Sequence, residues 1–405
     1  MTDLPEVSVV LPTFNRDTYI AESLRSVLNQ TLPPKEIVVV DDGSTDGTAD
    51  VVAAFAPRVR YVRQENAGKL TAIATGMDLT SGDLVWIMDD DDLATPHALE
   101  ALAAPFARDP EVVLTYGRMT RFADGDSEAA DELVDHPTDD RPFLVQMMED
   151  CFVTGHPCVL ARRDRLEALR PFDLSVIASV DYYLHLGVAM TGRSEFVDTV
   201  VLRQRQHNGL RGPAHARYTE AERNAKWIEH DAYLLRGILE TAPLQAYLDS
   251  PPWDGRTLDT EERRLALIQK AVIAGRKKLW PEALDALEVA MAILPEVPIS
   301  EREQMVLTGM LGSRYGIDEV YASPDIPGAL RAIIMQRTDR EAALTALSRP
   351  LLHEMKIARR EADPRRAGRA IQCWARLMDL RSTQAALHSA LGRNLNRAVS
   401  RFRFT

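Results

Sequence analysis

The chain has 405 residues, 45% of them hydrophobic and 27% charged, so it has room for two or three domains and most of it should fold. Its three cysteines form no CxxC pair, which argues against a disulfide framework and a cysteine zinc site and suits a reducing compartment. No apolar run approaches the ~20 residues of a membrane span, and the N-terminal residues do not have the pattern of a signal peptide, so we expect a soluble, cytoplasmic protein with a net charge of -12.

Short apolar runs alternate with stretches of helical periodicity in the first 90 residues. The runs of strand length are 7–11, 37–40, 59–62 and 84–88. Strands that alternate with helices in this way predict βαβ units and a mostly parallel sheet flanked by helices. Two later runs, 112–116 and 196–202, are further predicted strands.

Four consecutive acids, Asp89–Asp92, follow the fourth apolar run directly. Carboxylates this close repel one another and need either water or a cation to offset the repulsion. Asp89 and Asp91 would point to the same side of an extended chain, which suits two carboxylates that share one Mg²⁺ or Mn²⁺. A solvated acidic turn is the alternative.

Polar turns also follow the first and second predicted strands, at 12–16 and 41–48. The carboxyl ends of parallel strands lie on one edge of the sheet, so these turns and the acidic run should converge on a single cleft. A GxGxxG after the first strand and a GxxxxGK[ST] are both missing from the sequence. Neither a dinucleotide-binding fold nor a P-loop is therefore supported.

Taken in order, these motifs resemble those of family 2 glycosyltransferases. The matching segments are VSVVLPTFNR (7–16), IVVVDDGSTDGT (37–48), NAGK (66–69) and DDDD (89–92). The resemblance covers about residues 5 to 215. It implies an α/β fold of the GT-A type, that of nucleotide-diphospho-sugar transferases, in a domain over 1–217.

The resemblance also implies a nucleoside diphosphate sugar as donor, a UDP-sugar rather than a GDP-sugar. The residues it assigns to this donor are Pro12, Thr13, Phe14, Asn15, Arg16, Asp41, Asp42, Asn66, Lys69, Asp89, Asp90, Arg205 and Arg211. Phe14 would stack on the base and Asp42 would accept from a ring N–H, although a core aromatic and a helix cap are the structural alternatives. Lys69 is equally compatible with an exposed surface lysine.

For the metal, the resemblance assigns Asp89 and Asp91 to Mn²⁺ or Mg²⁺, with His207 completing the ligand set. The cation would neutralise charge on the leaving diphosphate. A structural histidine is the alternative for His207.

The catalytic base of the family is commonly the Asp of a Glu-Asp pair at the start of a helix, and the matching residue is Asp181. An inverting transfer needs such a base to take the proton of the attacking hydroxyl. This sequence departs from the pattern, because Val180 stands where the first acid is expected. Asp181 as a simple helix cap is the alternative.

From residue 218 onward we expect an all-α region, 218–405, with a candidate break near 250–256. Residues 353–405 contain twelve Lys+Arg and four Asp+Glu, and 382–400 has the pattern of a basic amphipathic helix. Such a helix lies on an anionic membrane or packs on the protein with its arginines in water. Peripheral contact with the inner face of the membrane is thus one expectation, and packing is the other.

The sequence favours an inverting, metal-dependent glycosyltransferase that acts on a hydroxyl of a polysaccharide, a lipid-linked glycan or a protein, without a nucleic-acid partner. Two alternatives stay open. A nucleotidyltransferase could use the same sheet and carboxylates, although the turn at 12–15 lacks the glycine-rich, basic loop that this reaction usually needs. The other is a catalytically inactive scaffold or binding protein with a degenerate GT-A domain; intact Asp89 and Asp91 argue against it, whereas Val180 keeps it open.

Overall fold

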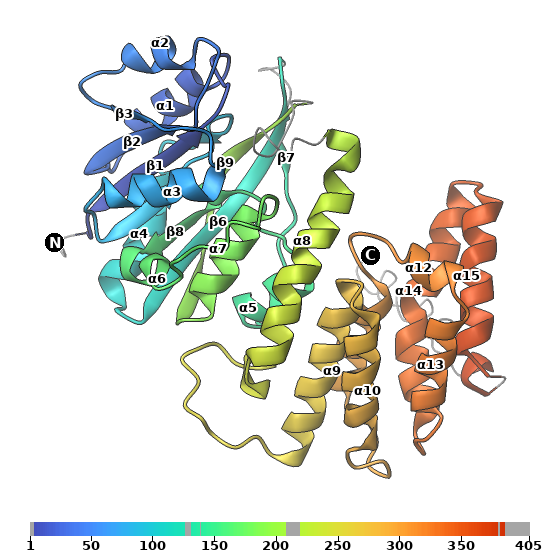
Figure 1. Cartoon of the computed structure of the whole chain (residues 1–405). Helices are drawn as coiled ribbons and strands as arrows, with labels where there is room; N and C mark the ends of the chain where they lie inside the picture. Colours follow the sequence, from blue (N-terminus) through green and yellow to red (C-terminus); the bar gives the residue numbers. More distant parts are fainter. Residues whose placement is uncertain (1–3, 126–130, 138, 208–218, 380, 385–405) are drawn as a thin grey trace, which may run out of the picture. The chain divides into compact units, whose positions relative to one another are not determined.

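The computed structural model describes residues 4–125, 131–137, 139–207, 219–379 and 381–384 (Figure 1). The chain divides into two compact units, one of Met1–Leu234 with Asp249–Asp254 and one of Leu235–Leu248 with Gly255–Thr405. Helix α8 (Glu220–Thr241), the first described helix after residue 217, contributes to both units. The domain boundary between 217 and 218 therefore stays a prediction.

A nine-stranded sheet forms the centre of the first unit, as far as its residues are described, in the order β3-β2-β1-β4-β8-β6-β9-β5, with β7 paired to β6. Its strands are β1 (Val7–Thr13), β2 (Glu36–Asp41), β3 (Arg60–Arg63), β4 (Leu84–Ile87), β5 (Leu93–Ala94), β6 (Val112–Ala123), β7 (Glu132–Leu133), β8 (Val159–Arg162) and β9 (Arg193–Gln206). The pairings among β1 to β4 are all parallel, whereas β8 runs antiparallel to β4 and β6.

Helices cover this sheet, as the alternating pattern predicted. Those of the first unit are α1 (Ile20–Leu28), α2 (Thr48–Ala53), α3 (Lys69–Asp78), α4 (Ala98–Arg108), α5 (Phe143–Glu149), α6 (Arg163–Glu167) and α7 (Val180–Ala189), with a 3₁₀ turn η1 (His156–Cys158). Helix α3 packs on β1 and β2, and α4 packs on β6 and β9. The α/β fold expected from the sequence is confirmed.

Strand β1 lies between β2 and β4, and this position sets the location of the site. Every residue of β1 and of β4 is buried, which explains why their sequences are continuous apolar runs rather than alternating ones. Thr13 at the end of β1 pairs with Asp41 at the end of β2, and Val10 pairs with Ile87 at the end of β4. The turns that follow these three strands therefore share one edge, as predicted.

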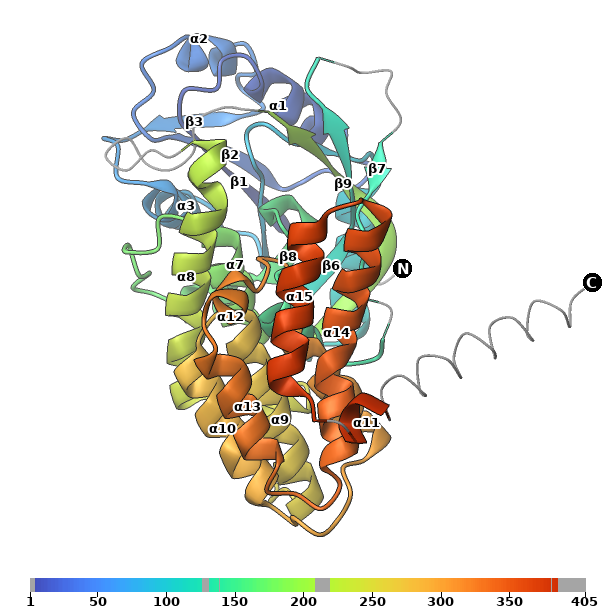
Figure 2. The ribbon, with the colours of Figure 1, turned by 90° about the vertical axis from the view of Figure 1, so that its right-hand side faces the viewer.

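The second unit is helical in its described residues. It contains α9 (Thr260–Arg276), α10 (Trp280–Ala292), α11 (Glu301–Thr308), α12 (Asp318–Ala322), α13 (Asp325–Ile334), α14 (Arg340–Arg360) and α15 (Pro364–Leu377), with 3₁₀ turns η3 (Leu244–Tyr247) and η4 (Gly309–Leu311). Helix α9 runs beside α10, and α14 beside α15 (Figure 2). None of the helices described in either unit has the length and hydrophobicity that a membrane span requires.

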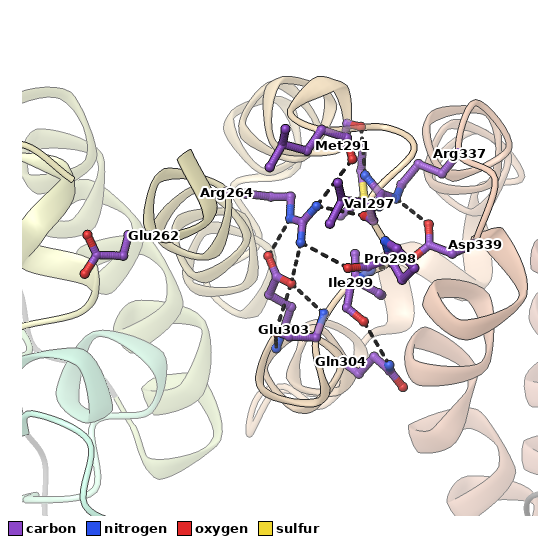
Figure 3. A network of polar contacts seen from close by, with 12 residues as sticks. Glu262, Arg264, Met291, Val297, Pro298, Ile299, Glu303, Gln304, Arg337 and Asp339 are labelled. Carbon is purple, nitrogen blue, oxygen red and sulfur yellow. Dashed lines mark hydrogen bonds and ion pairs between the residues drawn. The ribbon is translucent and has the colours of Figure 1, made fainter. Parts of the chain in front are cut away.

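A buried ion pair stabilises the second unit from inside (Figure 3). Arg264 of α9 donates to both carboxylate oxygens of Glu303 on α11, at 2.6 and 2.9 Å, and both side chains are at most 3% exposed. The same guanidinium donates to the carbonyl of Val297, and Arg337 donates to that carbonyl as well. The loop between α10 and α11 is thus held by two buried arginines.

We expect Arg264→Met to lower the free energy of unfolding of this unit by about 3–5 kcal/mol, because it leaves the Glu303 carboxylate buried without its partner. The exposed pair Arg236–Glu282 of the same unit provides the matched control. Arg236→Met should cost at most about 1 kcal/mol, since water already solvates that pair. Chemical unfolding followed by circular dichroism measures both losses, and equal losses would contradict the assignment.

Candidate active site

The turns after β1 and β2 are joined by hydrogen bonds into one edge. The Asn15 backbone N–H donates to the Ser44 hydroxyl at 2.8 Å, and the Asn15 side-chain oxygen accepts from the Thr45 N–H at 2.7 Å. Asn15 has φ 55°, in the left-handed region that asparagine tolerates better than most residues. The Arg16 N–H donates to the Thr48 hydroxyl at 2.9 Å. Asn15 thus shapes this edge, and its predicted contact with a donor stays a prediction.

Asp41 lies inside the turn after β2 and is fully buried. One of its carboxylate oxygens accepts from the Ser44 N–H at 2.7 Å, and the other accepts from the Tyr61 hydroxyl at 2.5 Å. Burial and this bond raise the pKa of Tyr61, so the phenol stays protonated as the donor. These contacts give Asp41 a part in building the turn.

Asp42 organises the segment that leads into α3. Its carboxylate accepts from the backbone N–H groups of Ala67 and Gly68, both at 2.8 Å, and from the Gln64 side-chain amide at 2.7 Å. The Asn66 amide donates to the Asp42 carbonyl at 2.7 Å. A carboxylate has about four acceptor positions, so one position remains for the predicted ring N–H of a base.

The acidic run leaves the extended conformation as soon as β4 ends, and the backbone bends at Asp90 and Asp91. The alternation that would have put Asp89 and Asp91 on one side therefore does not extend to them. Asp89 contacts the Lys69 ammonium at 2.5 Å, whereas the Asp91 carboxylate accepts from the ring N–H of His207 at 2.9 Å. Lys69 and His207 thus contact two carboxylates of the acidic run, although they lie far apart in the sequence.

Arg16 lies between two of these acids, with its Nε 3.4 Å from Asp90 and 3.7 Å from Asp91. Burial and repulsion by Asp91 raise the pKa of Asp90 to about 6. Burial acts the same way on Asp91, but the bond with His207 and the charge of Arg16 outweigh it and lower its pKa to about 2. Asp91 is therefore ionised at every physiological pH, and added positive charge would relieve the repulsion on Asp90.

Arg205 stabilises the acidic turn by hydrogen bonds. Its backbone N–H donates to the buried Asp92 at 2.8 Å, and its Nε donates to the Asp91 carbonyl at 2.9 Å. Its two terminal nitrogens donate to Glu22 at 2.5 Å and to Asp124 at 3.1 Å. Arg205 thus supports the acidic turn through its backbone N–H and Nε, and its terminal nitrogens are engaged by Glu22 and Asp124. Its predicted contact with a diphosphate stays a prediction.

Asp181 lies in the first turn of α7. This helix begins directly after Ser179, whose φ is 55°. One oxygen of Asp181 accepts from the Tyr182 N–H at 2.9 Å. Burial raises the pKa of Asp181 to about 6, Lys69 lowers it, and Asp89 raises it further. The predicted base therefore shares its electrostatic environment with the acidic run, although the two are 90 residues apart in sequence.

Three of the remaining residues predicted to bind the donor lie at the end of β1 or directly after it. Pro12 and Thr13 are buried within β1, and Phe14 is half-buried directly after it. Arg211 lies outside the described residues, so its role stays a prediction. The contacts of Arg205 with Glu22, Asp92 and Asp124 were not predicted from the sequence, because they depend on long-range packing.

The side chains at this edge suit a hard divalent cation that is shared with a ligand. Carboxylates and imidazole are donors for Mn²⁺, and carboxylates for Mg²⁺. In the described part of the chain, no group of three or more His, Cys, Asp or Glu side chains is placed so that it could hold a metal ion by itself. A metal held by one or two carboxylates together with phosphate oxygens needs no such group, so the predicted metal role of Asp89, Asp91 and His207 stays a prediction.

Comparison with known proteins gives one family match and several partial relatives. The model described as "Glycosyl transferase family 2" matches residues 8–169. The chondroitin synthase of Escherichia coli is 28% identical over 200 residues, which make up 49% of this chain and 28% of that protein. The validoxylamine A glucosyltransferase of Streptomyces hygroscopicus subsp. limoneus is 41% identical over 110 residues, or 26% of this chain and 24% of that protein. The chain thus matches less than a third of the length of these two relatives.

Two solved structures show similarity over most of the chain. S. aureus TarS 1–349 has a TM-score of 0.48 and 16% identity, covering 88% of this chain and 92% of that chain. The mannosyltransferase PcManGT from Pyrobaculum calidifontis, in complex with GDP-Man and Mn²⁺, has a TM-score of 0.48 and 21% identity, covering 85% and 86%.

Proposed function

We propose that the chain transfers a sugar from a nucleoside diphosphate donor to a hydroxyl acceptor, because residues 8–169 match the glycosyl transferase family 2 model and lie in an α/β unit. We propose further that this transfer depends on a divalent cation and inverts the configuration at the sugar carbon. The observation that carries the proposal is the contact of Lys69 with Asp89 at 2.5 Å, together with the effect of the Lys69 charge on the pKa of Asp91 and of Asp181.

We assign the donor diphosphate to the edge beside the acidic run. Asp89, Asp91 and His207 would hold Mn²⁺ or Mg²⁺, which supplies charge neutralisation for the departing diphosphate. Lys69 keeps its position through the contact with Asp89, and its own charge adds to the positive potential there. Burial lowers the pKa of Lys69, but attraction to Asp89 outweighs this effect and raises it overall, so the ammonium stays charged.

Asp181 is the proposed base. Its carboxylate would accept the proton of the acceptor hydroxyl while that oxygen forms a bond to C1 of the sugar. The bond from C1 to the diphosphate breaks on the opposite face, and the electron pair leaves with the diphosphate. A base works best when its pKa lies near the working pH, and the raised pKa of Asp181, about 6, meets this condition.

For the partners we propose a UDP-sugar as donor and a growing glycan as acceptor. The names of two relatives, a chondroitin synthase and a hyaluronan synthase of Pasteurella multocida, support a polysaccharide acceptor. Each of these is matched over only 12% of its length, so the acceptor of the whole protein is part of the proposal. A lipid-linked glycan or a protein acceptor is compatible with the same chemistry. Contact with a membrane through the basic C-terminal helix stays a prediction, because residues 385–405 lie outside the described ranges.

Calorimetric titration with UDP, GDP, CDP and dTDP, each with and without Mn²⁺, tests the donor assignment. We expect UDP to bind at least about tenfold more tightly with Mn²⁺ than without it, because the cation bridges the carboxylates and the diphosphate. Binding of a nucleoside triphosphate together with a sugar phosphate would instead support a nucleotidyltransferase. If no nucleotide binds under either condition, the inactive scaffold becomes the better explanation.

A further inference from the structure

A second buried carboxylate reaches the start of α7 from helix α8. Asp231 is 1% exposed, and its Oδ1 accepts a hydrogen bond from the Ser179 hydroxyl at 2.8 Å. Ser179 is the residue in the left-handed conformation that directly precedes α7. A serine rarely adopts this conformation unless its surroundings hold it there. The bond to Asp231 is a contact that does so.

We propose that Asp231 is a positioning residue for the base Asp181, which holds the turn at Ser179 and places a second negative charge beside the base. This inference rests on the proposed role of Asp181. Because Ser179 sets the direction in which the first turn of α7 leaves the loop, the bond also sets where Asp181 points. The residue before the base is the apolar Val180, so the chain supplies the second carboxylate from a distant helix instead.

Further contacts tie α8 to the segment that precedes α7. The Tyr233 hydroxyl donates to the Asp173 carboxylate at 2.7 Å, and the Asp173 N–H donates to the Tyr183 hydroxyl at 3.2 Å. These bonds bring α8 and α7 together independently of Asp231. The position of α8 therefore does not depend on the Ser179 bond alone, which allows the bond and the helix contact to be tested separately.

The charges that face the proposed base come from several elements. Lys69 on α3 favours its ionised form, whereas Asp89 after β4 and Asp231 on α8 favour its protonated form. Two other titratable groups nearby carry no charge at neutral pH. Burial raises the pKa of the Cys158 thiol, and burial together with Lys69 lowers the pKa of His185 to about 3. Asp231 thus opposes the effect of Lys69 on the proposed base.

The test compares Asp231→Asn, Ser179→Ala and Tyr233→Phe in the full chain, with donor affinity and the pH profile of kcat/KM as readouts. Asp231→Asn keeps an oxygen for the serine and removes the charge, so we expect the acid limb of the profile to move down by about half a pH unit. Ser179→Ala keeps the charge and removes the bond, so kcat should fall about tenfold while donor affinity is unchanged. Tyr233→Phe is the matched control for α8 contacts and should leave the acid limb unmoved.

An acid limb that stays in place in Asp231→Asn, or moves equally in Tyr233→Phe, overturns the charge effect. An unchanged kcat in Ser179→Ala overturns the positioning effect. If Asp231→Asn fails to fold, the kcat of Ser179→Ala alone tests whether the bond to Asp231 positions the base. Asp181→Asn is measured alongside. Should it keep full turnover, the assignment of the base fails and not merely the role of Asp231.

Discussion

Asp91→Ala is expected to reduce Mn²⁺-dependent nucleotide affinity by at least about 100-fold, the size of effect that follows when a metal site loses a charged ligand. Asp91 is the acid whose pKa is lowered to about 2, so it offers a full negative charge at any physiological pH. It also contacts the His207 ring at 2.9 Å, and its removal takes away the partner that orients this second proposed ligand. Titration of the variant with the preferred nucleotide, with and without Mn²⁺, measures the loss.

Two further variants separate the metal from other causes. Asp91→Asn keeps an oxygen beside His207 but lacks the charge, so it should lose nearly as much metal-dependent affinity as the alanine variant. Asp198→Asn removes a carboxylate of an exposed ion pair with Arg118 on the same unit, and its affinity should equal that of the unaltered protein. Full metal dependence in Asp91→Asn would show that Asp91 acts through the hydrogen bond and is not a ligand.

The edge of the sheet that carries the candidate site was predictable, because three of its strands can be recognised in the sequence. Strands β1, β2 and β4 are buried on both faces, so their sequences are continuous apolar runs whose ends are sharp. The rule that parallel strands share an edge then brings the turns together without any knowledge of side-chain contacts. The GT-A fold and the position of Asp181 at a helix start were instead implied by the resemblance to family 2 glycosyltransferases.

The contacts within that edge were not predictable, because they join residues that are far apart in sequence. Asp42 was expected to face a ligand, yet its carboxylate accepts from two backbone N–H groups before α3 and from the Gln64 side-chain amide. Arg205 was expected to face phosphate, yet it crosses to Glu22 on α1 and to Asp124. Periodicity and local motifs carry no information on such pairings, which depend on the packing of the complete sheet.

The partnership of α8 with α7 illustrates the same limit. The sequence showed Val180 where an acid was expected, and this departure weakened the assignment of the base. In the structure, Asp231 accepts from the hydroxyl of Ser179, the residue before Val180, although the two lie 52 residues apart in the sequence. The missing acid before Asp181 could be noticed from the sequence. That Asp231 of α8 contacts the same turn could be known only from the position of that helix in the structure.

Asp181→Asn is expected to lower the rate of sugar transfer by about 10²–10⁴-fold, the range that a general base contributes. The amide keeps the shape of the side chain and an oxygen for the Tyr182 N–H, so donor affinity should be unchanged. Single-turnover transfer to an acceptor glycan, together with nucleotide titration, separates the two properties. Loss of both together would point to a folding defect, and retained turnover would remove Asp181 as the base.

The same variant should also be more stable than the unaltered protein at neutral pH. Burial raises the pKa of Asp181 from 3.8 to about 6, so between these values the folded protein binds more protons than the unfolded chain. The free energy of unfolding then falls as pH rises through this window and stays lower above it, by about 1–3 kcal/mol. Asparagine does not ionise, so the variant escapes this loss, and thermal unfolding at pH 4 and pH 7.5 should show a gain only at the higher pH.

The helix-cap explanation of Asp181 predicts the opposite sign. Asp259 is a true cap of α9, whose carboxylate accepts from the Glu262 N–H at 2.8 Å. Asp259→Ala should therefore cost about 1 kcal/mol. If Asp181→Ala loses stability at pH 7.5 as Asp259→Ala does, Asp181 serves the helix. If it gains stability and loses turnover, the chain maintains a buried carboxylate at a cost to its own stability, and a base poised to accept a proton explains why.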